Sequence, residues 1–168
     1  MSRYYRTYLQ LEKYGAAVVD TIDAFGMYCM ENPFKTCSDV KEPTKRTWHD
    51  EHGDDEYIPA DGLRLAAYEN KVKFGFKGGT FGANDKLKSF LRYLRSGSMK
   101  MYCEFNRIGR CNVRLKSVEQ DLYRDVSDGE DILVVGVTFK FNNPTKDVIP
   151  VKSENGGVTD LIVLDDDE

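Results

Sequence analysis

Long hydrophobic runs are missing from this 168-residue chain. No apolar run approaches the roughly 20 residues that a helix needs to cross a membrane, and residues 1–10 lack the hydrophobic core of a signal peptide. We therefore expect no membrane association and a protein that is made and retained in a cytoplasm. Cysteine is also sparse, because only four residues occur and none has C-x-x-C spacing. Free thiols are predicted rather than a disulfide framework.

Histidine is scarcer still, with two residues, His49 and His52, in one acidic segment. The chain contains no G-x-S-x-G motif, and a serine or cysteine nucleophile would have few possible bases. His49 and His52 are weak candidates for a zinc or manganese site, but their spacing is not that of H-E-x-x-H, and an exposed acidic loop is the simpler interpretation. We expect no enzymatic activity, no cofactor and no bound metal.

Motifs for binding phosphate or nucleic acid are absent as well. Residues 77–82 are rich in glycine and precede a predicted helix, but they match neither G-x-x-x-x-G-K-[ST] nor G-x-G-x-x-G, so a strand-to-helix connection is favoured. Residues 106–109 predict a hairpin turn. An isoelectric point near 5.3 argues against a dedicated DNA-binding protein. We expect no specific nucleic-acid binding.

What the sequence does contain is a clear change of hydrophobic period between residues 68 and 141. Residues 71–77 alternate with period two, which predicts a half-buried strand. Residues 84–95 have a helical period, and residues 99–105, 110–118 and 132–141 return to strand patterns. The apolar stripe of the predicted helix consists of Leu87, Phe90, Leu91 and Leu94. This order predicts a mainly β (α+β) fold, as an antiparallel two-sheet β-sandwich or split barrel flanked by one α-helix.

The composition is that of a globular protein, with 40% hydrophobic and 31% charged residues. Residues 1–168 are predicted to form a single domain. Turn-forming and charged residues without a period predict a long polar loop at about residues 32–62. Residues 153–168 are expected to form a flexible acidic tail, in which residues 158–164 have the alternatives of one more strand or a docking segment.

Charge is unevenly distributed along the chain. Residues 49–61 contain six carboxylates and no Lys or Arg, whereas residues 86–116 contain nine basic residues and one acidic residue, Glu104. Two interpretations remain open: the regions meet between copies of the chain, or they are solvated surfaces that neutralise each other within one monomer. The candidate interface residues are Asp50, Glu51, Asp54, Asp55, Glu56, Arg92, Arg95, Arg107, Arg110 and Arg114.

Five segments are informative when they are taken in order: residues 25–27 (FGM), 52–59 (HGDDEYIP), 87–94 (LKSFLRYL), 110–115 (RCNVRL) and 132–144 (ILVVGVTFKFNNP). In this order they resemble small tail proteins of tailed bacteriophages and prophages. The likeness covers roughly residues 25–150 and is greatest to the distal tail and tail-tube group. The chain lacks the large C-terminal domain of many distal tail proteins, so the resemblance leaves tube, terminator, distal-tail and baseplate positions open.

The resemblance implies a non-enzymatic structural subunit of a phage or prophage tail. Such a subunit forms a homo-oligomeric ring, expected to be a hexamer, around the tail channel and contacts other tail proteins. It would be assembled in the bacterial host cytoplasm and reside in the virion tail. A second hypothesis is an intracellular β-sandwich module that recognises a small molecule or carbohydrate through Trp48, Tyr57 and the acidic loop. The mass in solution would separate the two.

Overall fold

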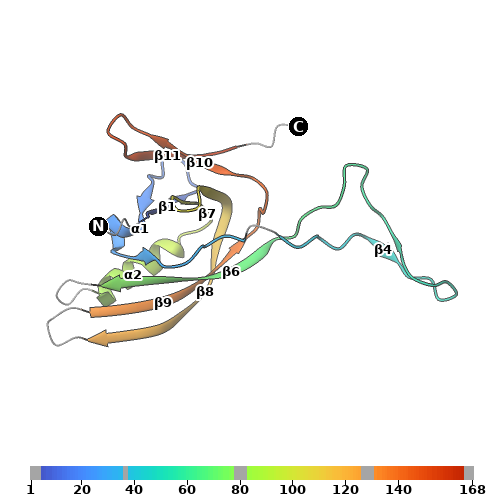
Figure 1. Ribbon diagram of the computed structural model, residues 1–168, viewed down its shortest axis with the longest axis horizontal. Helices are drawn as coiled ribbons and strands as arrows, with labels where there is room; N and C mark the ends of the chain where they lie inside the picture. Colours follow the sequence, from blue (N-terminus) through green and yellow to red (C-terminus); the bar gives the residue numbers. More distant parts are fainter. Residues whose placement is uncertain (1–4, 36–37, 78–82, 126–130, 165–168) are drawn as a thin grey trace.

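The computed structural model describes residues 5–35, 38–77, 83–125 and 131–164. The predicted mainly β fold is confirmed, because strands make up 45% of the structure and helices 11% (Figure 1). The strands are β1 (Thr7–Leu11), β2 (Val19–Asp20), β3 (Tyr28–Cys29), β4 (Lys45–Arg46), β5 (Asp55–Glu56), β6 (Tyr68–Lys77), β7 (Met99–Cys103), β8 (Ile108–Asp125), β9 (Asp131–Phe141), β10 (Val148–Lys152) and β11 (Val158–Val163). The helices are α1 (Thr21–Phe25) and α2 (Ala83–Leu94).

Seven strands form one antiparallel sheet in the order β2-β1-β7-β8-β9-β6-β3. Its longest uninterrupted ladder joins β6 to β9, from the pair Tyr68 and Phe141 to the pair Lys77 and Ile132. The other two sheets, β10-β11 and β4-β5, have only two strands each. The architecture is therefore one large sheet with a small hairpin against it, rather than two sheets of similar size.

The core lies between the large sheet and α2. Val72 and Phe74 are fully buried, as their alternation with lysines predicts. On α2, Phe90 and Leu94 are buried in the same cluster, whereas Leu91 is only partly buried at its margin. The stripe predicted for the helix is thus rotated slightly, because the sheet lies under Phe90 rather than under Leu91. Leu91 remains accessible at the side of the helix.

The short helix α1 is fixed by its two ends. The carboxylate of Asp20 accepts a hydrogen bond from the backbone N–H of Ile22, which is the usual arrangement at a helix start. Gly26, with φ of 66°, ends the helix in a left-handed conformation that glycine adopts without strain. The ring of Phe25 then lies 5.4 Å from that of Phe90, centroid to centroid, so α1 closes one end of the core.

A bulge in β8 changes which face each side chain occupies. Met101 pairs with Arg110 and Met99 pairs with Val113, so β8 contains one extra residue between these pairs. The extra residue is accommodated at Asn112, whose φ of 54° is left-handed. Val113 consequently joins the main core, while Cys111 faces the opposite side of the sheet. Strict alternation along the strand predicted at residues 110–118 would place residues 111 and 113 on one face, and such a pattern cannot anticipate an inserted residue.

The hairpin of β10 and β11 packs on the face of the sheet opposite α2. Val148 and Leu161 are buried there with Cys111. Gly109 permits this contact, because a Cβ atom at that position would lie 2.4 Å from the backbone oxygen of Val148. Of the two alternatives given for residues 158–164 within the expected flexible tail, the strand is confirmed, because residues 158–163 pair with β10. The burial of Leu161 explains why this segment is held. Residues 165–168 lie outside the described residues.

Two connections were predicted from the sequence, the hairpin turn after β7 and the glycine-rich segment after β6. The turn between β7 and β8 occupies residues 104–107, two residues earlier than predicted, with Arg107 in a left-handed conformation at φ of 56°. Phe105 belongs to this turn, so it is exposed and contacts Tyr5 at a centroid distance of 4.9 Å rather than extending the core. The glycine-rich connection at residues 78–82 lies outside the described residues.

Candidate functional site

A long arm projects from the body of the protein (Figure 1). The arm comprises residues 38–67, which run outward and return as an antiparallel pair. Backbone N–H groups of Lys41 and Ala66 donate to the carbonyls of Arg64 and Asp39, both at 2.7 Å, and β4 pairs with β5 further out. The bounds differ from the polar loop expected at residues 32–62, because Phe34 is buried beside Phe141 in the body.

The arm has no core of its own. No residue between 38 and 67, all of which the structure describes, is fully buried. Of the fourteen large hydrophobic residues that are exposed in the described chain, six lie on the arm. They are Val40, Trp48, Tyr57, Ile58, Leu63 and Leu65. The arm therefore exposes apolar surface that its own fold does not cover.

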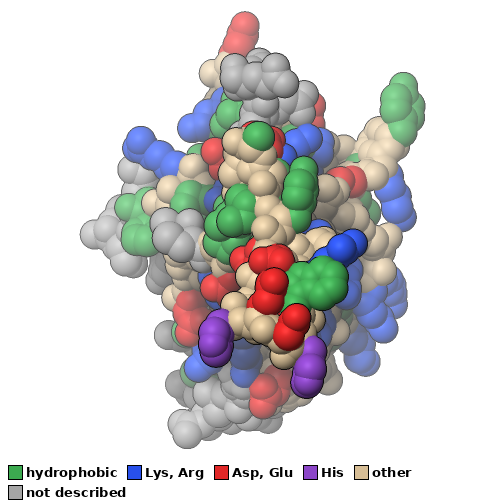
Figure 2. Space-filling model, turned by 90° about the vertical axis from the view of Figure 1, so that its right-hand side faces the viewer, with side chains coloured by type: hydrophobic (Ala, Val, Ile, Leu, Met, Phe, Trp, Pro, Cys, Tyr) green, Lys and Arg blue, Asp and Glu red, His purple; other side chains and the backbone are tan. Residues whose placement is uncertain are grey.

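Acidic side chains are concentrated at the arm tip, defined here as residues 47–58. The tip contains five carboxylates and no Lys or Arg: Asp50, Glu51, Asp54, Asp55 and Glu56. Figure 2 views the arm end-on and shows the acidic groups gathered beside a hydrophobic side chain. Two contacts within the tip order it: Thr47 Oγ1 donates to Asp54 at 2.7 Å, and Trp48 Nε1 donates to Asp55 at 3.0 Å. Asp50 and Glu51 lie in the exposed turn between them.

The two histidines lie on this tip, and both are exposed. Among the residues that the structure describes, no three His, Cys, Asp or Glu side chains come together closely enough to hold a metal ion. Trp48 and Tyr57, proposed above as a ligand-binding pair, are likewise exposed and lie outside the hollows of the body. Trp48 instead has the guanidinium of Arg46 over its ring, 6.0 Å from the centroid.

A basic groove lies on the body between α2 and β8. It is formed by two adjoining hollows of about 490 and 400 Å³ that share Arg95 and Leu115. Its basic residues are Lys88, Arg92, Arg95, Arg114 and Lys116. Its accessible apolar members are Leu91, Leu115 and Val118, and buried Leu94 lies beneath them. The groove thus combines an apolar floor with a rim of one charge sign.

The positive charge of the groove is only partly neutralised within the molecule. Lys116 pairs with Glu69 at 2.5 Å, and the proximity of this lysine holds the pKa of Glu69 below its ordinary value. A second carboxylate near the groove, Glu119 on β8, pairs with Lys71 at 2.7 Å. Within the described part of the chain, Arg92, Arg95 and the other two basic residues of the groove have no carboxylate within ion-pair distance.

The groove also follows a free edge of the sheet. β7 pairs with β8 only as far as Val113. From Arg114 to Gln120, β8 has β9 on one side and, among the described strands, no neighbour on the other. Edge strands present unpaired backbone N–H and C=O groups to incoming chains. Backbone groups and basic side chains therefore occur along the same border of the body.

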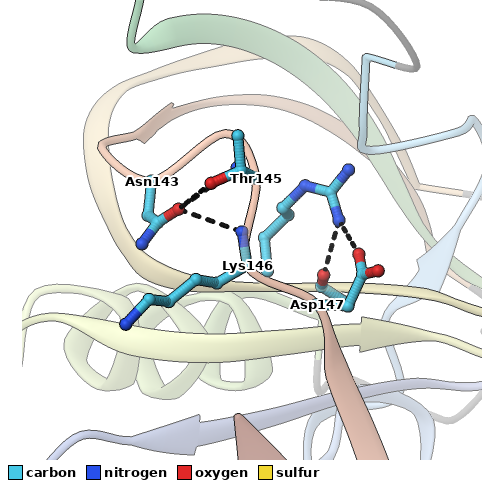
Figure 3. A network of polar contacts seen from close by, with 6 residues as sticks. Asn143, Thr145, Lys146 and Asp147 are labelled. Carbon is cyan, nitrogen blue, oxygen red and sulfur yellow. Dashed lines mark hydrogen bonds and ion pairs between the residues drawn. The ribbon is translucent and has the colours of Figure 1, made fainter. Parts of the chain in front are cut away.

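The remaining basic candidates behave differently. Arg107 is exposed in the turn after β7, away from the groove. Arg110 is 8% exposed, and its guanidinium donates to Asp147 at 2.5 Å. Figure 3 shows how Asp147 is placed: the side-chain oxygen of Asn143 accepts hydrogen bonds from Thr145 and from the backbone of Lys146, which turns the chain toward Asp147. Arg110 is thus held inside the body by Asp147 and does not line the groove.

A third hollow, of about 280 Å³, lies beside β3 and contains two thiols, Cys29 and Cys103. Cys29, Cys103 and Cys111 are free thiols, as the absence of paired spacing predicts. Burial raises the pKa of Cys29 to about 11, and its Sγ donates to the carbonyl of Glu31 at 3.1 Å. A thiol with that pKa stays protonated at neutral pH and is a poor nucleophile. Cys37 lies outside the described residues.

Comparisons with known proteins add no identification. The chain matches no protein-family model, and no curated protein or solved structure is significantly similar to it. None of the helices in the described residues has both the length and the apolar character needed to cross a membrane.

Proposed function

We propose that the protein is a non-enzymatic assembly subunit that forms a ring with copies of itself and belongs to the tail of a bacteriophage or prophage. The observation that carries the assembly role is the arm, a segment of 30 residues without a single buried side chain. The tail setting, at a distal-tail, tail-tube or baseplate position in the virion, rests on the sequence resemblance alone. Six subunits in the ring and contacts with other tail proteins are part of this proposal.

The free-energy cost of ordering the arm supports an assembly role. Fixing the backbone of one residue costs about 1–2 kcal/mol, and burial of apolar surface is the principal term that offsets this cost in a folded domain. The arm has hydrogen bonds between its two segments but buries no core, and exposed Tyr57 and Ile58 gain nothing from the monomer. Contact with a second protein supplies the missing burial. A ring subunit offers such a neighbour at every position.

The test removes the arm without disturbing the body. Lys41 N–H donates to the carbonyl of Arg64, so the chain segments are adjacent there, and Asn-Gly in place of residues 42–63 would close them with a tight turn. We expect this armless variant to fold as a monomer, while the full chain forms rings visible by electron microscopy and a larger species by light scattering. A strict monomer for the full chain at high concentration would contradict the proposal.

The tail setting needs a separate measurement. Co-expression with the products of adjacent reading frames, followed by affinity purification and mass spectrometry, should recover tail proteins with the full chain and not with the armless variant. Rings that bind no such partner would retain the assembly role and remove the tail assignment.

A further inference from the structure

We infer that the basic groove between α2 and β8 is the docking surface for the acidic arm tip of a second copy of this chain. This inference rests on the proposed function, because it names the surface that the arm contacts during assembly. It corresponds to the first of the two interpretations of the charge distribution, contact between copies of the chain.

The charges of the arm tip and of the groove are complementary. The tip has five carboxylates and no Lys or Arg. In the described chain, four basic residues of the groove have no carboxylate within ion-pair distance, namely Lys88, Arg92, Arg95 and Arg114, whereas the ammonium of Lys116 is directed at Glu69. Complementary potentials of this kind steer association and fix the register of an interface. A neutral or basic partner would leave the guanidinium groups of Arg92 and Arg95 without counter-charge.

Shape and polarity agree with the charge. The tip presents Trp48, Tyr57 and Ile58 next to its carboxylates, and the groove presents Leu91, Leu115 and Val118 between its basic groups. Apolar anchors surrounded by a charged rim are the usual composition of a specific interface. The tip is carried by the two-stranded pair of β4 and β5, and the free edge of β8 offers backbone groups that such an extended segment can meet.

Geometry excludes the same contact within one molecule. The arm extends away from the side of the body that carries α2, so the tip is remote from its own groove (Figure 1). Two different surfaces must therefore meet between copies, which is a head-to-tail contact. Repetition of a head-to-tail contact generates a closed ring when its rotation closes and a filament when it does not.

Charge reversal on either side tests the contact. Arg92→Glu with Arg95→Glu changes the groove, and Asp50→Lys with Glu51→Lys changes the tip at residues outside its internal hydrogen bonds. Each pair of substitutions should raise the dissociation constant of assembly about 100-fold. The combination of all four substitutions should restore most of the lost affinity. Raising NaCl from 0.05 to 0.5 M should raise the dissociation constant of the wild-type assembly. It should not raise the dissociation constants of the charge-reversed variants any further.

The matched control is Lys86→Glu with Lys152→Glu, which makes the same change in net charge outside the groove. It should assemble like the wild-type chain, and circular dichroism should show all variants folded. If the groove variant also assembles like the wild type, the inference is wrong while the proposed assembly role stands. If the wild-type chain never associates, both the inference and the proposed function fail.

A mixing experiment gives the sharpest outcome. The armless variant retains its groove, and the Arg92→Glu, Arg95→Glu variant retains its arm. Neither should associate alone, but an equimolar mixture should form a one-to-one dimer, measured by analytical ultracentrifugation. No complex in the mixture, from two folded variants that each lose self-association, would overturn the arm-to-groove contact and point to another surface for the arm.

Discussion

The arm and the body are both built from antiparallel strands, yet they are held in different ways. In the body, β6 and β9 bury Phe74, Val135 and Phe139 completely under α2. In the arm, β4 and β5 pair through the backbone, but all four of their residues are exposed. Backbone pairing thus occurs in both regions, and burial distinguishes the region that is stable by itself from the region that needs a partner.

The largest expected effect comes from removing a side chain that unites the sheet with both helices. Phe90→Ala should lower the free energy of unfolding by about 3–5 kcal/mol, because the ring is fully buried between Phe25 and Phe74. The matched change in the arm, Trp48→Ala, should alter it by less than about 0.5 kcal/mol. Urea denaturation of dilute, monomeric protein measures both. Comparable losses would show that the arm belongs to the folding unit of the body.

A smaller effect is expected where the hairpin crosses the sheet. Gly109→Ala would place a Cβ against the backbone of Val148, and we expect a loss of about 1–3 kcal/mol as β10 is displaced. Gly157→Ala serves as the control, because its nearest neighbour would be the side chain of Ser153 at 3.6 Å. Thermal unfolding of the two variants makes the comparison. Equal stability would mean that β10 does not lie close against β8.

The bulge in β8 should contribute a loss of similar or lesser size. Asn112→Val forces a β-branched residue to adopt a φ of 54°, at a cost of about 1–2 kcal/mol. Asn112→Gly relieves that strain and should match or slightly exceed the wild type. Denaturant midpoints for the pair measure the difference. If valine is tolerated as well as glycine, the extra residue lies elsewhere in the strand.

The smallest effect concerns exposed ion pairs in acid. Pairing with Lys116 lowers the pKa of Glu69 in the folded protein, and pairing with Lys71 lowers that of Glu119. The two ion pairs therefore stabilise the folded state fully at a pH above the pKa that these carboxyl groups have in the unfolded chain. This stabilisation is lost as the pH falls through their lower pKa in the folded protein. Glu69→Gln with Glu119→Gln should therefore be slightly less stable than wild type at pH 6 and indistinguishable at pH 3.

The arm provides the comparison for this acid effect. The guanidinium of Arg64 lowers the pKa of Asp61 in the same way. Asp61→Asn should nevertheless leave the unfolding of the body unchanged at both pH values, because the arm contributes no burial to that unit. Denaturant titrations at pH 6 and pH 3 follow both variants. A pH-dependent loss for the arm variant would remove the distinction between the two regions.

Several parts of this protein follow from residue order alone. The alternation at Val72 and Phe74 predicts the buried face of β6, and the helical spacing of Phe90 and Leu94 predicts α2 to within one residue at each end. Gly97 follows the helix with a positive φ of 141°, which glycine adopts more readily than other residues. These features are local, because side-chain period and backbone preference act over a few residues.

The candidate site was predicted only in part. The acidic and basic regions are visible in the sequence, but Arg110 belongs to the body and Arg107 lies away from the groove. Lys88 and Lys116 were absent from the candidate interface residues and line the groove. Sequence spacing cannot show that residues of a helix and a distant strand converge.

By itself, the sequence therefore determined the mainly β class, the position of the long helix and the opposite charges of two segments. Only the tertiary structure decided that residues 38–67 extend away from the body, that Asn112 turns Cys111 to the second face and that β8 ends with a free edge beside α2. The physical reason is that these features depend on contacts between residues far apart in the chain. Local periodicity carries no information about such contacts.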